Sequence, residues 1–190
     1  MLKWVFFVTF TFIAAVSVYL FFYLGGYKKV TLTETHYQTL NLVFKKHLGP
    51  YHKINLVIKA VEELAGPVGY KCQKTFGEYL DDPAKVDKSR LRAIGGCIVD
   101  QQVTELPEGV HFKKVKARPV LKAEFRGAPS IGPFKVYPKA MDYIASHGLK
   151  MAGPTLEIYQ MLPGDEFLTE FLFPLQKGSP SVNQETENQR

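Results

Sequence analysis

The order of apolar and polar positions after residue 26 predicts two strands followed by a helix. Residues 27–35 and 38–48 are rich in Val, Thr, Tyr, Leu and Phe and are interrupted near His36, so we expect two strands there. From Ile54 to Ala65, apolar side chains recur at steps of three and four residues. This spacing predicts a helix with one apolar face, which ends before the helix breakers Gly66-Pro67.

Two more strands complete the first half of the chain. Residues 70–80 and 91–99 favour extended structure, and a polar run from Asp81 to Arg90 joins them. Asp81 and Asp82 stand directly before Pro83, which is typical of a turn and not of a pair of catalytic carboxylates. The order of elements in this half is therefore β-β-α-β-β.

The second half repeats this order in degenerate form. The expected elements are a strand at 112–125, a helix from about Pro138 to His147 that buries Met141, Ile144 and Ala145, and strands at 155–161 and 167–174 around a Pro163-Gly164-Asp165 turn. Tyr159 follows Tyr79 by 80 positions, in the corresponding strand. Internal repetition defines the architecture, so we predict an α+β fold of duplicated β-α-β-β units. These units would form an antiparallel sheet with two helices and a central cleft, where ligands commonly bind.

The N-terminal segment has the composition of a transmembrane helix. Residues 4–24 carry no charge, and a helix of this length can cross a hydrocarbon core of about 30 Å. Trp4, Tyr19 and Tyr23 stand near its ends, where such side chains favour the membrane interface. A cleaved signal peptide is the alternative, but its apolar region is usually only about 7 to 15 residues long. We therefore expect a membrane anchor.

These patterns divide the chain into three parts. We expect a transmembrane anchor at 1–26, a ligand-binding domain at 27–175, and a disordered polar tail at 176–190. The basic residues Lys28 and Lys29 follow the apolar segment, whereas Lys3 alone precedes it. The positive-inside rule therefore predicts a single-pass protein with a cytoplasmic domain.

Composition and charge are those of one folded domain. Of the 190 residues, 46% are apolar and 22% are charged, and the net charge is +6. The basic residues are scattered among acidic ones, so we expect no nucleic-acid partner. Cys72 and Cys97 are too few for a disulfide framework. We expect two buried free thiols, although the pair could form one bridge in an oxidising compartment.

Glu157 is the leading candidate for chemistry. It lies within an otherwise apolar strand, where alternation places Leu156 and Ile158 on one face and Glu157 and Tyr159 on the other. The matching position of the first half is Gly77, which would leave space opposite the carboxylate. A partly buried carboxylate in such a gap suits recognition of a cation or a hydrogen-bond donor, and burial would raise its pKa.

The predicted ligand site combines this acid with aromatic residues of the cleft. Its members are Glu157, Tyr159, Tyr79, Gly77, Tyr51 and Phe125, with Tyr37 and Phe44 as further aromatic candidates. The five histidines show no metal-ligand spacing, and the chain lacks a P-loop, a G-x-G-x-x-G loop and a G-x-S-x-G elbow. We therefore expect no metal and no cofactor, and we do not expect an enzyme.

Several segments together resemble the GyrI-like small-molecule-binding domains, which are related to bacterial effector-binding domains. The matching segments are Gly49-Pro50-Tyr51, Gly77-Glu78-Tyr79-Leu80-Asp81-Asp82-Pro83, Ala123-Glu124-Phe125-Arg126-Gly127 and Pro154-Thr155-Leu156-Glu157-Ile158-Tyr159, in an order that spans about 30–174. The resemblance implies a duplicated β-α-β-β fold, and it implies that Glu157 is the ligand-contacting acid.

The apolar N-terminal helix, together with residues 156–160, also resembles the testis-expressed ER-phagy receptor of animals. That receptor has a long acidic tail with an autophagy motif, whereas this chain ends in a short polar tail, so we do not expect that role. The absence of a helix-turn-helix segment likewise argues against a transcription factor.

Three functions fit these features. The leading one is a membrane-anchored module that binds a small molecule, cationic or amphipathic in character. The second is a hydrolase of reactive small molecules, which the resemblance implies for some relatives, with Glu157 as general base. The third is a membrane adaptor that recruits protein partners.

Overall fold

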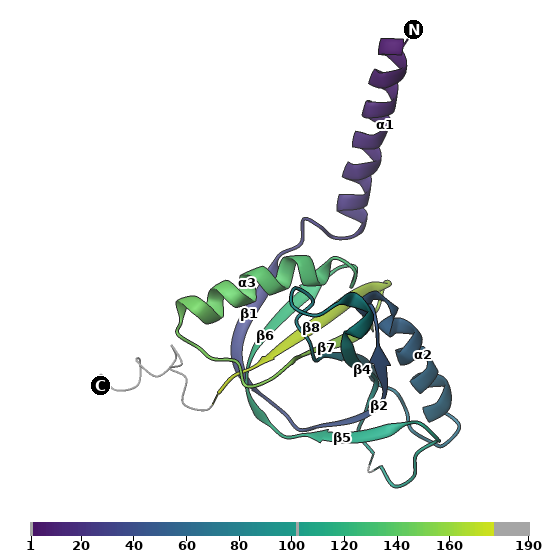
Figure 1. Ribbon diagram of the computed structural model, residues 1–190, viewed down its shortest axis with the longest axis vertical. Coiled ribbons are helices and arrows are strands. Elements are labelled where there is room, and N and C mark those ends of the chain that lie inside the picture. The colour runs from purple at the N-terminus through teal and green to yellow at the C-terminus, as the bar shows by residue number, and fades with distance from the viewer. Residues whose placement is uncertain (1, 102, 177–190) are drawn as a thin grey trace.

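The computed structural model describes residues 2–101 and 103–176 and has the predicted α+β fold (Figure 1). Eight strands form one antiparallel sheet in the order β1-β6-β8-β7-β3-β4-β2-β5. The strands are β1 (Val30–Tyr37), β2 (Leu40–Leu48), β3 (Lys74–Tyr79), β4 (Arg92–Val99), β5 (His111–Val115), β6 (Arg118–Arg126), β7 (Thr155–Leu162) and β8 (Glu166–Pro174). The helices are α1 (Leu2–Tyr23), α2 (Ile54–Ala65) and α3 (Gly132–Ser146), with short 3-10 turns at Tyr51–Lys53 and Lys88–Arg90.

The two repeats meet at the centre of the sheet. β3 and β7 pair antiparallel there, and Gly77 lies directly opposite Glu157. Outward from this pair, the neighbouring strands are equivalent in the two repeats: β4 lies beside β3 and β8 beside β7, followed by β2 and β6. The edge strands are exchanged: β1 of the first repeat pairs with β6, and β5 of the second repeat pairs with β2. A pseudo-two-fold axis therefore passes between Gly77 and Glu157.

Both α2 and α3 pack on the same face of the sheet, one on each half. The apolar stripe predicted for α2 is buried at Ile54, Ile58, Val61 and Ala65. These side chains contact β2 and β4, whereas α3 packs its own stripe against β1, β6 and β8. α2 also contacts the central strand β3, and the centre of the sheet, β3 with β7, lies between the two helices.

The opposite face of the sheet buries a second apolar core. Phe76, Leu156 and Ile158 of the central strands belong to it, and so do residues of β2, β4, β6 and β8. Tyr37 of β1 and Val115 of β5 also pack against this cluster, although β1 and β5 are the two edges of the sheet. The sheet is therefore strongly curved, as Figure 1 shows. Its concave side is filled by the side chains of this cluster.

The second repeat differs from the sequence prediction in two places. The single strand expected at 112–125 is two strands, β5 and β6, separated at residues 116–117 because the chain crosses there from β2 to β1. The second helix begins at Gly132, six residues before the expected Pro138, with Pro133 in its first turn, where the missing N–H costs nothing.

The buried face of α3 is also shifted from the prediction. Gly132, Val136, Ala140 and Ile144 face the core, whereas Met141 and Ala145, which we expected to be buried, are exposed. Proline favours the first turn of a helix, which is why a start at Pro138 was expected. In the structure Pro138 lies inside α3, on its exposed face.

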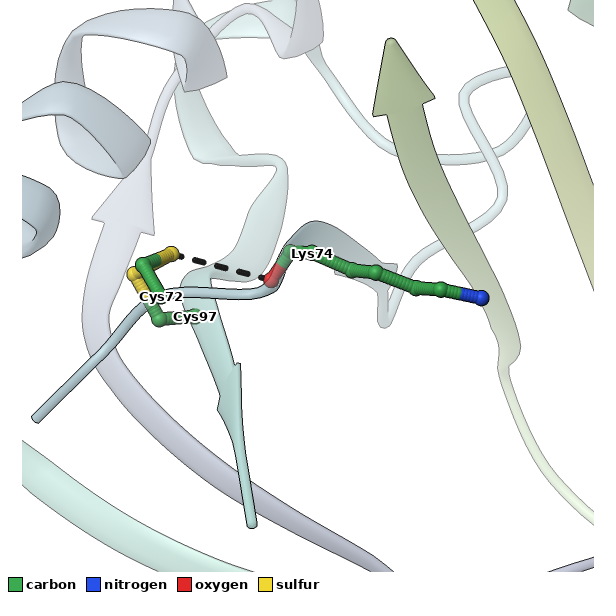
Figure 2. The surroundings of a disulfide bond; sticks show 3 residues. All are labelled: Cys72, Lys74 and Cys97. Atoms are coloured by element: carbon green, nitrogen blue, oxygen red, sulfur yellow. Dashed lines mark hydrogen bonds between the residues drawn. A yellow bond between two sulfur atoms is a disulfide. The ribbon is translucent and has the colours of Figure 1, made fainter. Parts of the chain in front are cut away.

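Cys72 and Cys97 form a disulfide, so the expectation of two free thiols is wrong (Figure 2). The pair ties the segment before β3 to β4, with Cα atoms 5.1 Å apart, within the usual range for a bridge. Cys97 is fully buried under α2. The Sγ atom of Cys72 lies 3.7 Å from the carbonyl oxygen of Lys74, and this is a non-bonded contact because a bridged sulfur carries no proton.

The apolar segment at the N-terminus is one continuous helix that projects from the domain (Figure 1). The segment Lys3–Tyr23 is long and apolar enough to cross a membrane, and none of its side chains is buried. The hydroxyl of Thr11 donates to the carbonyl oxygen of Phe7, as expected for a polar group in an apolar helix. Of the tail predicted to be disordered, residues 177–190 lie outside the described part of the chain.

Candidate functional site

A large open cleft lies on the helix-bearing face, between α2 and α3, with a volume of about 1670 Å³. Its floor is formed by the central strands β3 and β7. Its walls are α2 with Tyr51, the first turns of α3, and the loops at 80–83 and 129–130. The cleft predicted between the two repeats is therefore present, with room for a bulky organic ligand.

Glu157 lies at the centre of the cleft floor. Strand alternation turns Leu156 and Ile158 into the concave core, so Glu157 and Tyr159 face the helices, as predicted. Only 3% of Glu157 is exposed. A carboxylate almost fully removed from water is costly unless its oxygens are hydrogen-bonded.

Three tyrosine hydroxyls form a directed chain to this carboxylate. Tyr137 of α3 donates to Oε1 of Glu157 at 2.9 Å, and Tyr159 donates to Oε2 at 3.0 Å. The hydroxyl of Tyr79 lies 2.8 Å from that of Tyr159. Because Tyr159 uses its proton on Glu157, Tyr79 is the donor of this third bond.

Gly77 positions the chain of tyrosines, although not by leaving an empty gap. A Cβ atom at Gly77 would lie 3.1 Å from the Tyr79 hydroxyl and 3.2 Å from Cδ1 of Ile54. The space opposite Glu157 is therefore filled by the ring of Tyr79, which folds over the glycine toward Tyr159. The ring of Tyr51 packs edge-on against Tyr79, with centroids 4.7 Å apart, and its hydroxyl donates to the carbonyl oxygen of Asp81.

Burial changes the acidity of every group in this cluster. Loss of water raises the pKa of Glu157 from 4.5 to about 7, although the bonds from Tyr137 and Tyr159 oppose the rise. Burial and then the nearby Glu157 carboxylate raise the pKa of Tyr79, Tyr137 and Tyr159 above the ordinary value. These tyrosines therefore stay protonated and act as donors, while Glu157 can carry or release a proton near neutral pH.

Glu157 has no basic partner among the described residues. By contrast, Glu78 on the other face of β3 binds Lys113 at 2.7 Å, and Asp81 at the cleft edge binds Arg92 at 2.7 Å. The tyrosines supply hydrogen bonds but no positive charge. When Glu157 is ionised, the cleft floor therefore carries a negative charge that no basic side chain of the described residues balances.

The structure brings most of the predicted site residues together. Glu157, Tyr159, Tyr79 and Tyr51 line the cleft, and Gly77 lies in its floor beside Glu157. Phe125 does not line the cleft, because it is fully buried beneath α3. The further aromatic candidates, Phe44 and Tyr37, belong to the concave core on the far side of the sheet.

Sequence reasoning missed Tyr137 and the aromatic rim of the cleft. Tyr137 precedes Pro138 and was excluded when the helix was expected to start at that proline. The start of α3 at Gly132 places Tyr137 one position after Val136, which is buried, and turns its hydroxyl toward Glu157. Phe134, three residues earlier, is 81% exposed at the mouth of the cleft.

Comparisons with known proteins agree with this architecture. The family model of the GyrI-like small molecule binding domain matches residues 33–176. No curated protein matches the chain. Among solved structures, the C-terminal domain of EcmrR is similar, with a TM-score of 0.64 and 15% identity over 79% of this chain and 98% of that one.

Two further solved structures share the fold. An integron cassette protein from the mobile metagenome of Vibrio cholerae has a TM-score of 0.53 and 14% identity, covering 76% of this chain and 95% of that one. SAV2435 bound to tetraphenylphosphonium has a TM-score of 0.52 and 12% identity, covering 77% of this chain and 94% of that one.

The raised pKa of Glu157 predicts how stability depends on pH. Between pH 4.5 and about 7 the folded protein holds a proton on Glu157 that the unfolded chain releases, so the free energy of unfolding falls as pH rises through this window. We expect Glu157→Gln, which mimics the protonated acid, to remove this component. The free energy of unfolding of the variant, measured relative to that of wild type, should therefore rise by on the order of 2–3 kcal/mol from pH 5 to pH 8.

Urea denaturation of both proteins at pH 5 and pH 8 measures this difference. Glu62→Gln, which removes an exposed carboxylate from the same cleft, is the matched control and should follow wild type at both pH values. Parallel pH profiles for wild type and Glu157→Gln would contradict a raised pKa at Glu157.

Proposed function

The chain belongs to the GyrI-like small-molecule-binding domain family, and we propose that its cleft binds an amphipathic organic cation through Glu157. The match at 33–176 supports a binding domain with the bounds expected from sequence, 27–175. The single observation that carries the proposal is the buried Glu157 carboxylate, held by two tyrosine hydroxyls and lacking a basic partner among the described residues.

Ligand charge and shape follow from the surroundings of this carboxylate. A cation placed above it gains Coulomb attraction in a poorly hydrated site, and the aromatic rings of Tyr51 and Tyr79, which line the cleft, are available for cation–π attraction. The size of the cleft and its apolar rim favour a ligand with large hydrophobic groups. Tetraphenylphosphonium, the ligand in the SAV2435 structure, combines these properties and is therefore a suitable probe.

We expect tetraphenylphosphonium and similar lipophilic cations to raise the melting temperature of the full-length protein at pH 8, where Glu157 is ionised. Neutral analogues of the same size should stabilise it less. Glu157→Gln should lose most of the shift, whereas Glu62→Gln should retain it. If no cation stabilises the protein, or if Glu157→Gln responds like wild type, the proposal fails.

A hydrolase that uses Glu157 is the second candidate, because a pKa of about 7 suits a general base. Chemical analysis of small molecules after incubation with the protein separates the two functions. A binding module leaves its ligand chemically unchanged after prolonged incubation. A hydrolase would consume reactive ligands, and Glu157→Gln would stop the turnover.

We further propose that α1 anchors the domain in a membrane as a single-pass helix. The helix is apolar, and none of it is buried against the domain. Transfer of its side chains from water into lipid would therefore be favourable. A cleaved signal sequence has similar composition and position, so the proposal depends on retention of the helix in the mature protein.

Two features bear on the side of the membrane that the domain occupies. Two lysines, Lys28 and Lys29, follow the helix and one, Lys3, precedes it, which favours the cytoplasmic domain expected from sequence. The difference between the two flanks is a single lysine. The Cys72–Cys97 disulfide favours an oxidising compartment, where such bridges form and persist. Since the bridge is a covalent feature of the folded domain, we propose the oxidising side and not the cytoplasm.

Both proposals predict the behaviour of the full-length chain in isolated membranes. The protein should resist extraction by alkaline carbonate and keep the intact mass of the uncleaved chain. A maleimide reagent, added under denaturing conditions, should modify Cys72 and Cys97 only after reduction. Release of a shortened chain would identify a signal peptide, and labelling without reduction would place the domain in a reducing compartment.

A further inference from the structure

The residue that follows α1, Leu24, is hydrogen-bonded to the segment that forms one rim of the cleft. The amide of Ala128 donates to the carbonyl oxygen of Leu24 at 3.0 Å, and the next residue, Pro129, lines the cleft. Successive Cα atoms are about 3.8 Å apart. Pro129, the first residue of the rim, is therefore the direct neighbour of the residue that bonds to Leu24. The geometry of this contact fixes where the cleft opens relative to α1.

The junction is built from packed backbone and is not a free hinge. Gly25 is buried with φ of +79°, and a Cβ atom there would lie 3.2 Å from the Cα atom of Gly127. Only glycine adopts this conformation at so close an approach. The Gly25-Gly26 pair, which follows the apolar segment in sequence, therefore allows α1 to dock against the 127–128 segment.

Side chains fasten the same junction from two directions. Lys135 in the first turn of α3 donates to the carbonyl oxygens of Gly26 and Lys28. Lys28 in turn pairs with Glu166 at the start of β8. The α3 rim and the β7–β8 hairpin are thus both tied to the residues that leave α1, so the domain has one preferred orientation on its helix.

The rim that this junction holds beside α1 is aromatic and basic. Phe134 lies in the chain between Ala128 and Lys135, both of which bond to the residues that directly follow α1, and it is 81% exposed. Tyr27 and Lys29, directly after the helix, are also exposed. Aromatic rings and lysines are the side chains that favour the boundary between hydrocarbon and lipid headgroups.

We infer that the Pro129–Phe134 rim of the cleft lies in the headgroup layer of the membrane that α1 spans, and that ligands enter the cleft from this layer. The inference rests on the proposed anchoring and binding functions and adds the source of the ligand: amphiphiles that have already partitioned into the bilayer surface. The occupant of the exposed rim is the lipid interface, which matches the apolar ring of Phe134 and the positive charge of Lys29.

Fluorescence quenching by brominated lipids tests this placement in the full-length chain. The only tryptophan is Trp4, so Trp4→Phe gives a silent background, into which Phe134→Trp places a reporter at the rim. Phe112→Trp is the matched control, because Phe112 is an exposed phenylalanine of β5, at the end of the domain away from α1 (Figure 1). Both proteins are reconstituted in liposomes that contain an anionic lipid.

Lipids brominated near the headgroups should remove most of the Phe134→Trp emission and leave the Phe112→Trp emission at its value in unbrominated liposomes. Melting curves equal to that of the Trp4→Phe parent show that each variant is folded. Equal emission of the Phe134→Trp protein in brominated and unbrominated liposomes would overturn the placement, even if lipophilic cations still stabilise the protein. Strong quenching without any cation response would instead refute the binding function and leave the placement standing.

Discussion

The pairing of Gly77 with Glu157 is the contact on which the rest of the site depends. The two residues occupy equivalent positions of the two repeats, and the antiparallel pairing of β3 with β7 sets them face to face. Directly opposed side chains on neighbouring strands have Cβ atoms roughly 5 Å apart, so carboxylates in both repeats would repel each other. A duplicated fold can therefore place one buried acid at its centre only if the two repeats diverge at this position. Glycine in β3 and glutamate in β7 are that divergence.

The same asymmetry builds the hydrogen-bond network. Because Gly77 has no side chain, Tyr79 folds across it and donates to Tyr159, which donates to Glu157. Tyr137 reaches the second carboxylate oxygen from α3. The network keeps both oxygens hydrogen-bonded but leaves the charge unbalanced, so burial still raises the pKa of Glu157 to about 7. A cation in the cleft would supply the missing charge and would thereby raise the free energy of unfolding.

Local patterns predicted most of this arrangement. The bounds of α2 and the position of Glu157 opposite Gly77 follow from periodicity and from the internal repeat, since each depends on residues close in sequence or on a fixed offset. The start of α3 did not follow, because Pro138 resembles a helix start and its acceptance on the exposed face depends on tertiary packing. Tyr137 was missed for the same reason. Phe125 was misplaced because aromatic residues of the core and of a cleft look alike in sequence, and only the position of α3 decides between them.

The disulfide and the junction with α1 do not follow from the sequence, since two cysteines can be free or bridged and the Gly25-Gly26 pair can form a free hinge or a packed turn. In the folded protein, Cys72 lines the cleft, Cys97 is buried beneath α2, and Gly25 packs against Gly127. Each of these contacts joins segments far apart in the chain. The contacts of Gly25 place the cleft beside the apolar helix, and the disulfide ties the segment before β3 to β4.

The affinity of the full-length protein for tetraphenylphosphonium as a function of pH tests the central role of Glu157 most directly. Below a pKa of about 7 the cation must displace a proton, so the dissociation constant of wild type should rise as pH falls, approaching about tenfold per pH unit. In Glu157→Gln the affinity should be weaker and independent of pH. A wild-type dissociation constant that does not change between pH 5.5 and pH 8 would contradict the account.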